Sequence, residues 1–501
     1  MILTLLIFLP LVGAVALYLV PITRAWRWIA TLTGVLAFIT SIVIAVQFNW
    51  QHGTLQFDER VPWIPALGSS YHLAIDGLSL PLILLTTLLT FLALLYCWRQ
   101  ERFPREYFAL YLVMETGLLG FFSTMDLLLF YVFFEIALVP MYFIIGLWGH
   151  EQRRLESALK FFLYTRVGSL AVLLSILGLY LGTNPHTFDL PTIIAARPFV
   201  GTGTGAFLIL LGFLVGFGIK LPVIPLHSWL PDAHTEAPTE GSVVLAGLLL
   251  KLGGYGLLRL ALPTVPGAFS AWAVPIAALA VVSAIYGAAV AMAQTDLKRL
   301  IAFTSVNHMG YVLLGIAISA ALYANPADRT AAASGATYQL VAHGLVTSML
   351  FFLVGMLADR TGTREISRLS GIWTAIPLYG SLLAFAMFAS LGLPALAHFT
   401  AEVQVVLGTL GVYAWAAFGM LFGILVTTAM FLWTLQRVLM GKRSPEAEKL
   451  PALSKRELLT LAPLLVLIIL LGILPGPLVS IIDAALRSGP LGPIGLFMRG
   501  G

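Results

Sequence analysis

Apolar stretches close to the length of a membrane span recur along the whole chain. An α-helix needs about 20 consecutive apolar residues to cross the hydrocarbon core of a bilayer. The pattern therefore predicts an all-α polytopic membrane protein with about fourteen transmembrane helices. The expected spans are residues 2–21, 27–47, 77–98, 107–124, 127–146, 157–182, 205–225, 240–261, 273–293, 300–321, 335–357, 373–410, 414–437 and 458–483.

Prolines indicate that two of these spans are discontinuous. Pro222 and Pro225 follow directly after the apolar run that ends at Lys220. The stretch 373–410 is too long for one straight span, and it contains Leu393-Pro394. Because proline removes a backbone donor and breaks a helix, we expect interruptions in helices seven and twelve.

The interrupted spans lie five apart, which suggests two five-helix repeats of opposite orientation, as in secondary transporters. Residues 107–261 would form the first repeat (helices 4–8), and residues 262–437 the second (helices 9–13). Residues 1–106 would hold helices 1–3, and residues 438–501 helix 14 and the carboxyl tail.

The basic residues indicate the orientation in the membrane. Most of the 28 lysines and arginines lie in the odd-numbered connections between the expected spans. Because cytoplasmic loops carry an excess of Lys and Arg, both termini are expected on the outer, periplasmic or lumenal side. The amino terminus has no basic region before its apolar run, so we expect a retained first helix.

Composition excludes several classes of protein. Only 10% of the residues are charged and the mean hydropathy is +0.95, whereas soluble proteins carry about 25% charged residues. Cys97 is the only cysteine, which excludes an iron–sulfur cluster or disulfide framework built by this chain alone. No Gly-rich phosphate loop occurs between a strand and a helix. We expect no cofactor or metal in this chain, and no nucleic-acid partner.

Several ionisable residues lie inside or beside the apolar runs. An ionisable group at membrane depth is costly, so each is a functional candidate. A proton crosses hydrocarbon only by hopping between such groups and ordered water. The candidates are Glu115, Glu135, Lys220, Lys251, His343 and Glu402.

Glu135 and Lys220 form the candidate switch. A buried lysine can be charged or neutral, and a nearby carboxylate favours its charged form. Lys251 would be the next group to carry the proton. The structural alternatives are that the Glu135–Lys220 pair only holds helices together, that Glu115 has a structural role, and that His343 is an ordinary core histidine.

Two arginines in the spans have simpler explanations. Arg259 is expected to extend to the membrane surface at the extracellular end. Arg166 either extends to the surface or pairs with a carboxylate. Gly212 and Gly216 share a helix face with Lys220, which would let a neighbouring helix approach closely.

The segment His227–Pro238 contains two histidines and two acids. Metal binding is one interpretation, but His227 and His234 lack a clear helical spacing. A rigid cytoplasmic loop through which protons enter is the favoured interpretation.

Four stretches carry long and specific motifs: Ala74–Leu89, Met125–Gly149, Leu221–Arg259 and Asp296–Gly315. They resemble the antiporter-like subunits of type M in respiratory complex I (NADH–quinone oxidoreductase). The wider family includes L- and N-type subunits, the D subunit of photosynthetic NDH-1, and Mrp-type cation/proton antiporters.

The resemblance implies fourteen helices, two inverted repeats and discontinuous helices seven and twelve. A glutamate at the helix-twelve position favours the M type, since L and N types carry lysine there. The resemblance assigns proton-path roles to Glu135, Lys220, Lys251, His343 and Glu402. Secondary candidates for the proton path are Glu115, His227, His308 and His398.

The resemblance also implies partners. Flavin and iron–sulfur clusters are expected in partner subunits, and the neighbours would be L-, N- and K-type subunits and lipids. The membrane would be a bacterial inner (plasma) membrane or a thylakoid membrane. The alternative function is a subunit of a stand-alone Mrp-type antiporter. A purely structural scaffold would not need so many buried ionisable groups.

One departure from the family pattern lies in LPALAHFTAE, residues Leu393–Glu402. Ala395 and Ala401 stand where the family usually has glycine, and His398 lies one helical turn before Glu402. His398→Ala is therefore expected to change the pH dependence of proton transport more than assembly. Unchanged pumping across a pH titration would count against this.

Overall fold

The computed structural model describes residues 1–150, 153–448, 450–488, 492 and 494. Helices dominate these residues, and eleven are long and apolar enough to cross a membrane. These are α1 (Ile2–Leu19), α2 (Thr23–Gln47), α3 with its following turn (Leu80–Arg99), α5 (Leu127–Trp148), α6 (Arg154–Gly182), Thr239–Thr264, α14 (Ala273–Met292), α15 (Leu297–Ala320), α16 (Pro326–Thr361), α20 (Ala414–Leu439) and α21 (Lys455–Ile473).

The other expected spans are less regular. Helix α4 (Pro104–Ser123) follows the expected span 107–124. The apolar helices α8 (Thr204–Lys220) and α18 (Pro377–Ser390) are shorter than a full span. The polytopic helical fold class is thus confirmed, while the count of fourteen and the two repeats stay predictions.

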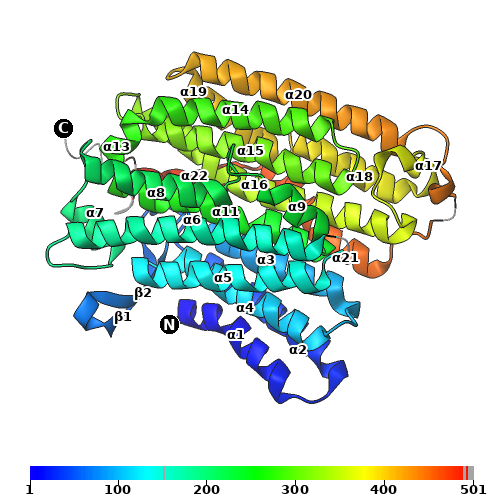
Figure 1. The fold of residues 1–501 in the computed structure, drawn as a ribbon, viewed down its shortest axis with the longest axis horizontal. Helices are drawn as coiled ribbons and strands as arrows, with labels where there is room; N and C mark the ends of the chain where they lie inside the picture. The colour runs from blue at the N-terminus through cyan, green and yellow to red at the C-terminus, as the bar shows by residue number, and fades with distance from the viewer. Residues whose placement is uncertain (151–152, 449, 489–491, 493, 495–501) are drawn as a thin grey trace.

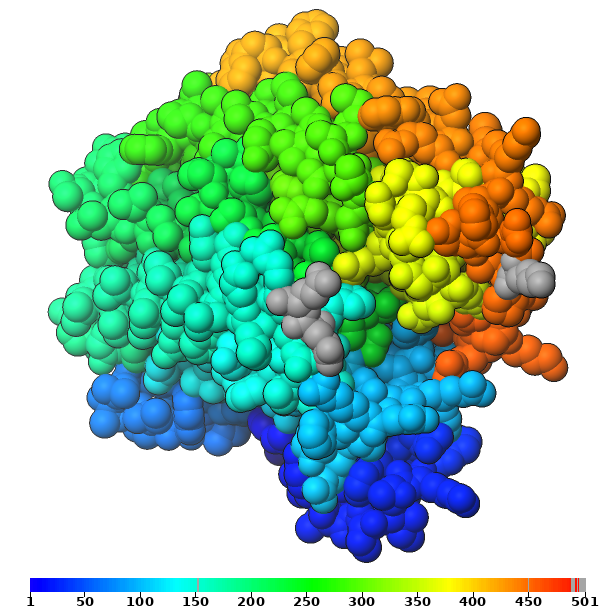
Figure 2. All heavy atoms as spheres, turned by 45° about the vertical axis from the view of Figure 1, so that its right-hand side comes forward, coloured from blue at the N-terminus to red at the C-terminus, as the bar shows by residue number. Residues whose placement is uncertain are grey.

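Three helices form the centre of the bundle. In Thr239–Thr264, α15 and α16, the most apolar stretch is completely buried, whereas in α21 only 22% of it is. Figure 1 shows the helices running side by side, with α20 along one edge and α1 and α2 at the opposite edge. In Figure 2 the N-terminal residues project from one flank of the molecule. The central helices therefore hold the groups that are shielded from both lipid and water.

Two helices are interrupted at the expected places. Helix α8 ends at Lys220, and the chain resumes as α9 (Trp229–Glu236) after the two prolines. Helix α18 ends at Ser390, and α19 (Ala397–Leu410) begins after the turn around Pro394. The expected interruptions near Lys220 and Leu393 are observed.

The segment His227–Pro238 differs from its prediction as a loop. Most of it forms α9, which packs against α6 and α15. His234 is fully buried, and His227 is 9% exposed. The sequence suggested a loop because half of these residues are polar and two are prolines, but the structure makes this segment the second part of a broken, buried helix.

Two π-helical turns interrupt the central helix Thr239–Thr264. It comprises α10 (Thr239–Val244), the π turn η3 (Leu245–Leu249), α11 (Lys251–Gly256), the π turn η4 (Leu257–Ala261) and α12 (Leu262–Thr264). A π turn displaces backbone carbonyls from regular helical hydrogen bonding, and such turns occur frequently at functional sites. The first of these turns ends at Leu249, two residues before Lys251.

The last predicted span, 458–483, is wrong in its extent. Helix α21 ends at Ile473, and a separate helix α22 (Gly476–Ser488) follows. Leu474-Pro475 separates them, because proline cannot continue the hydrogen bonding of the first helix. The predicted carboxyl tail after Ser488 lies almost entirely outside the described residues.

A β-hairpin lies between α2 and α3 and was not predicted. Strands β1 (Gln56–Ile64) and β2 (Ser69–Ile75) pair antiparallel. His72 in β2 contacts Asp189, the N-cap of α7 (Leu190–Ala196), at 2.7 Å. Burial alone lowers the pKa of His72, but its hydrogen bond to Asp189 and the charges of Asp189 and Asp58 outweigh burial and raise that pKa. The hairpin is thereby held to the chain between α6 and α8.

The remaining elements are short connections. They are α13 (Pro266–Ala271), α17 (Ile372–Ala375), and the 3-10 turns η1 (Pro65–Leu67), η2 (Cys97–Arg99), η5 (Ile366–Arg368) and η6 (Pro445–Ala447).

Candidate functional site

Lys220 lies at the C-terminal end of α8, where the helix breaks. Its side chain is 2% exposed, and Nζ has no hydrogen-bond partner among the described residues. The ammonium lies 5.3 Å from the ring centroid of Phe134 and 5.6 Å from that of Phe161. A cation over aromatic faces is stabilised without a fixed hydrogen bond. Lys220 is therefore a buried amine at the helix break that is not fixed by a hydrogen bond to any described residue.

Close helix packing surrounds this lysine, as its glycines predicted. A Cβ at Gly216 would lie 2.5 Å from the Gly168 oxygen, and a Cβ at Gly212 would lie 2.2 Å from Ser175 Oγ. Both contacts are with α6. Only glycine lets α8 and α6 approach this closely.

Glu135 contacts Arg166 in the structure, and its expected role as a switch with Lys220 stays a prediction. Arg166 Nη1 donates to Glu135 Oε2 at 2.5 Å, across α5 and α6. No ion pair within 4.0 Å joins Glu135 to Lys220 in the part of the chain that the structure describes. The side chain of Arg166, which is 44% exposed, reaches the Glu135 carboxylate from α6. One of the two interpretations of Arg166, pairing with a carboxylate, is confirmed.

Lys251 and His343 form a direct buried contact. Lys251 Nζ lies 2.8 Å from His343 Nδ1 and donates to the Ala246 carbonyl at 2.6 Å. Ala246 belongs to the π turn η3, where the regular α-helical hydrogen-bond pattern is interrupted. Both side chains are fully buried. In the charged state Lys251 Nζ can only donate, so His343 Nδ1 is then the acceptor of this contact.

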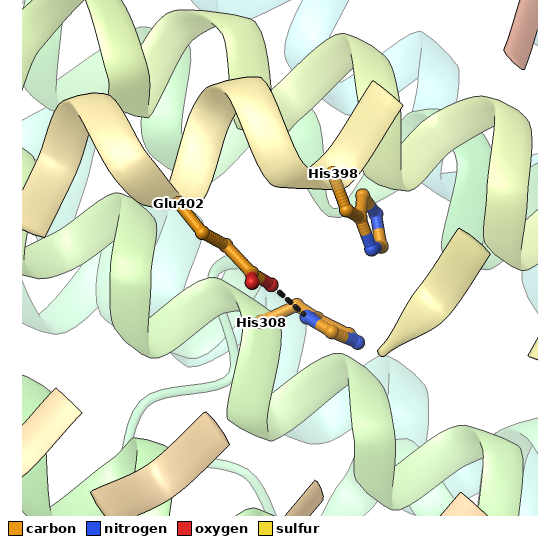
Figure 3. Close-up of side chains that lie close together, drawn as sticks. All are labelled: His308, His398 and Glu402. Carbon is orange, nitrogen blue, oxygen red and sulfur yellow. Dashed lines mark ion pairs between the residues drawn. The ribbon is translucent and has the colours of Figure 1, made fainter. Parts of the chain in front are cut away.

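Three histidines converge on Glu402. The ring centroid of His308 lies 5.7 Å from that of His343 and 4.5 Å from that of His398. Figure 3 shows His308 on α15 facing His398 and Glu402, which both come from α19. His308 Nδ1 is 3.5 Å from Glu402 Oε1. The central lysine and the second broken helix are therefore connected by imidazoles.

The break before α19 has an unusual backbone. Ala395 adopts φ +70°, a left-handed conformation that glycine adopts without steric cost. Gly392 also has a positive φ (+77°), and a Cβ there would lie 2.5 Å from Glu402 Oε2. Glycine at 392 thus makes room for the carboxylate, while alanine at 395 accepts strain where the family pattern has glycine.

Glu115 stands apart from these contacts. It is fully buried in α4, and within the described residues neither carboxylate oxygen has a hydrogen-bond partner. His227 lies between aromatic rings, 5.3 Å from the Tyr286 centroid and 6.3 Å from that of Phe303. His234 stacks on Phe351 at 4.7 Å. The structure does not bring these three residues into the group formed by Lys251, His343, His308 and Glu402.

Arg259 was expected to extend to the membrane surface, and this is wrong. It is 1% exposed and donates to Asp76, which is also buried. Its Nε additionally bonds Tyr255 Oη at 3.2 Å. No local pattern pointed to this partner, because Asp76 lies 183 positions away along the chain.

Two more buried charges lie at the edges of apolar runs and were missed. Lys298 is 3% exposed and donates to the Ala237 carbonyl, at the end of α9, at 2.5 Å. Glu240 is 6% exposed and accepts a hydrogen bond from Tyr107. Their position beside prolines and basic residues made them resemble ordinary loop residues.

Comparison with known proteins places this geometry in a family. The family described as "NADH:quinone oxidoreductase/Mrp antiporter, TM" matches residues 124–431. The NADH-quinone oxidoreductase subunit M of Escherichia coli (strain K12) is 40% identical over 478 residues, which cover 92% of this chain and 91% of that protein.

Solved structures give the same result. A chain of respiratory complex I from Thermus thermophilus with bound NADH superposes with a TM-score of 0.87 and 31% identity, over 100% of both chains. A chain of the Mrp complex from Dietzia sp. DQ12-45-1b has a TM-score of 0.83 at 23% identity, covering 97% of this chain and 52% of that one, and so shares the fold. The chain therefore belongs to the NADH:quinone oxidoreductase/Mrp antiporter family, as an antiporter-like membrane subunit of the kind found in oxidoreductase complexes.

Proposed function

We propose that this chain translocates protons in the membrane arm of an NADH:quinone or ferredoxin:quinone oxidoreductase. The observation that carries the proposal is the buried Lys251–His343 contact of 2.8 Å in the centre of the bundle. Burying several ionisable groups inside a membrane protein costs free energy, and groups of this kind commonly form proton relays. Flavin and iron–sulfur chemistry would belong to partner subunits.

The proposed route begins at Glu135 and Lys220. Lys251 comes next, because the end of α8 touches the helix that carries it: a Cβ at Gly253 would lie 2.5 Å from the Phe217 oxygen. His343 accepts from Lys251, and His308 leads to Glu402. Steps longer than a hydrogen bond require a bridging water.

The Arg166 contact changes the role of Glu135 in this route. A carboxylate held by Arg166 can leave that partner and move towards Lys220, which would favour the charged lysine. The switch would then be the exchange of Glu135 between Arg166 and Lys220. Glu115, His227 and His398 are secondary candidates for the path.

Orientation and neighbours complete the proposal. The distribution of basic residues supports both termini on the outer side of a bacterial inner or thylakoid membrane. L-, N- and K-type subunits and lipids would cover the apolar flanks. Val12, Leu19 and Val46 on α1 and α2 are at least 64% exposed, as expected of such flanks.

A stand-alone Mrp-type antiporter is the second candidate, since that family shares the fold. Full-length identity favours the oxidoreductase, because the solved complex I chain is 31% identical over its whole length. Purification of the tagged chain from its native membrane separates the two. Redox subunits in the complex support the oxidoreductase, and a complex without redox centres supports the antiporter.

Lys220→Ala tests the proposed route. We expect an assembled complex in which the ratio of protons moved to electrons transferred falls, because Lys220 is the free ammonium at the break. The ratio is measured in membrane vesicles with a ΔpH-sensitive dye and a quinone-reduction assay. Lys455→Ala, at an exposed position, is the matched control and should pump normally. Normal pumping by assembled Lys220→Ala would refute the route.

A further inference from the structure

His308, His398 and Glu402 form a compact set of metal-ligand atoms at the second helix break. One ligand atom from each lies within 4.8 Å of the other two. Zinc takes nitrogen at about 2.0–2.1 Å and carboxylate oxygen at about 2.0–2.2 Å, so a central ion is within about 1 Å of bonding distance to all three. His398 and Glu402 are four residues apart on α19 and therefore share one helix face.

Ser390 orients both imidazoles for metal binding. His398 Nδ1 is 3.2 Å from the Ser390 carbonyl, which can only accept, so Nδ1 carries the proton and Nε2 keeps its lone pair. His308 Nε2 is 3.1 Å from Ser390 Oγ, a hydroxyl that can accept or donate; when it accepts, the Nδ1 lone pair faces Glu402. A hydrogen bond on the second ring nitrogen is the usual support of a histidine ligand.

The lone pairs that would bind the ion are otherwise unused. His398 is fully buried and His308 is 1% exposed. Among the described residues, His308 Nδ1 and His398 Nε2 have no hydrogen-bond partner. Buried polar atoms normally have partners, so two unpartnered nitrogens beside a carboxylate indicate a ligand.

We propose that His308, His398 and Glu402 bind a divalent transition-metal cation, with Zn²⁺ the best match to two imidazoles and one carboxylate. This differs from the expectation that the chain binds no metal, and it does not depend on the proposed route. Three protein ligands leave a coordination position open for water. Because the ligands must be deprotonated, a bound cation competes with any proton carried by the same side chains.

A cobalt titration tests the site directly. The full-length chain, purified with a tag that contains no histidine, is incubated to equilibrium with Co²⁺, whose visible absorption reports its coordination geometry. We expect one Co²⁺ to bind per chain, with the visible spectrum of an ion that has few ligands. Added Zn²⁺ should displace this Co²⁺. His398→Asn and Glu402→Gln should each weaken binding at least about tenfold, since even losing an outer hydrogen-bond partner costs about 10- to 100-fold.

Two further variants complete the experiment. Ser390→Ala keeps all three ligands and should weaken binding through His308 alone, by about tenfold. His186→Asn, at an exposed position, should leave the titration unchanged. The proposal is overturned if the wild-type chain shows no single stoichiometric site, a measurement that needs no variant to fold. It is also overturned if folded His398→Asn binds Co²⁺ as wild type does, which would indicate only a hydrogen-bonded His308–Glu402 contact.

Discussion

Lys251→Met is expected to stop proton transfer from Lys251 through His343 and His308 to Glu402 while leaving the chain folded. Methionine fills a similar volume without a charge or a donor, so His343 Nδ1 loses its contact. Groups that transfer protons in a reaction contribute about 10²–10⁴-fold, so flux along this route should fall about a hundredfold or more. The measurement is the ratio of protons moved to electrons transferred in vesicles, together with the electron-transfer rate.

Lys251→Arg separates proton carriage from structural support. Arginine keeps the positive charge but does not deprotonate in proteins, so a proton carrier is not rescued whereas a structural cation is. Lys442→Met, at an exposed position, is the matched control and should change neither quantity. If Lys251→Met leaves both the ratio and the rate unchanged in assembled complex, Lys251 does not carry protons.

The helices were predictable because their signals are local. Runs of apolar residues give the spans, and the prolines at 222, 225 and 394 give the two interruptions, since a missing donor acts within one turn. Pro475 carries the same signal and was overlooked inside a continuous apolar run. The hairpin was missed because its strands are short, half-polar and lie between two much stronger helical patterns.

The side-chain contacts were less predictable because they join distant segments. Lys251 and His343 were both selected as costly charges, but their 2.8 Å contact depends on how α16 packs against Thr239–Thr264. Arg166 was expected either to reach the surface or to pair with a carboxylate, and only the packing of α5 against α6 identifies that carboxylate as Glu135. The free-energy cost of burying a charge identifies candidate functional residues from the sequence, whereas the packing of the helices decides which side chains they contact.

The buried Asp76–Arg259 ion pair illustrates that difference, since it joins the start of α3 to the central helix. Asp76 Oδ1 also accepts from the backbone nitrogens of Leu78 and Ser79 at 3.0 and 3.2 Å. The arginine lies over the Tyr255 ring, 5.4 Å from its centroid. Arg259 Nη2 and Nε are thus hydrogen-bonded, whereas Nη1 has no hydrogen-bond partner among the described residues. A buried pair is tolerated when its geometry is good and further hydrogen bonds support it.

Asp76→Asn and Arg259→Gln are each expected to destabilise the chain by about 3–5 kcal/mol, because each leaves one uncompensated charge buried. The loss would appear as a lower thermal midpoint in detergent and less assembled complex. The double variant removes both charges and should recover a large part of the stability, so the cycle gives a strong coupling energy. Glu156→Gln, which breaks the exposed pair with Arg153, is the control and should leave the thermal midpoint nearly unchanged, because water and salt screen exposed ion pairs. If the single variants were as mild as this control, water would have to reach Asp76 and Arg259, and the pair would not hold α3 to the central helix.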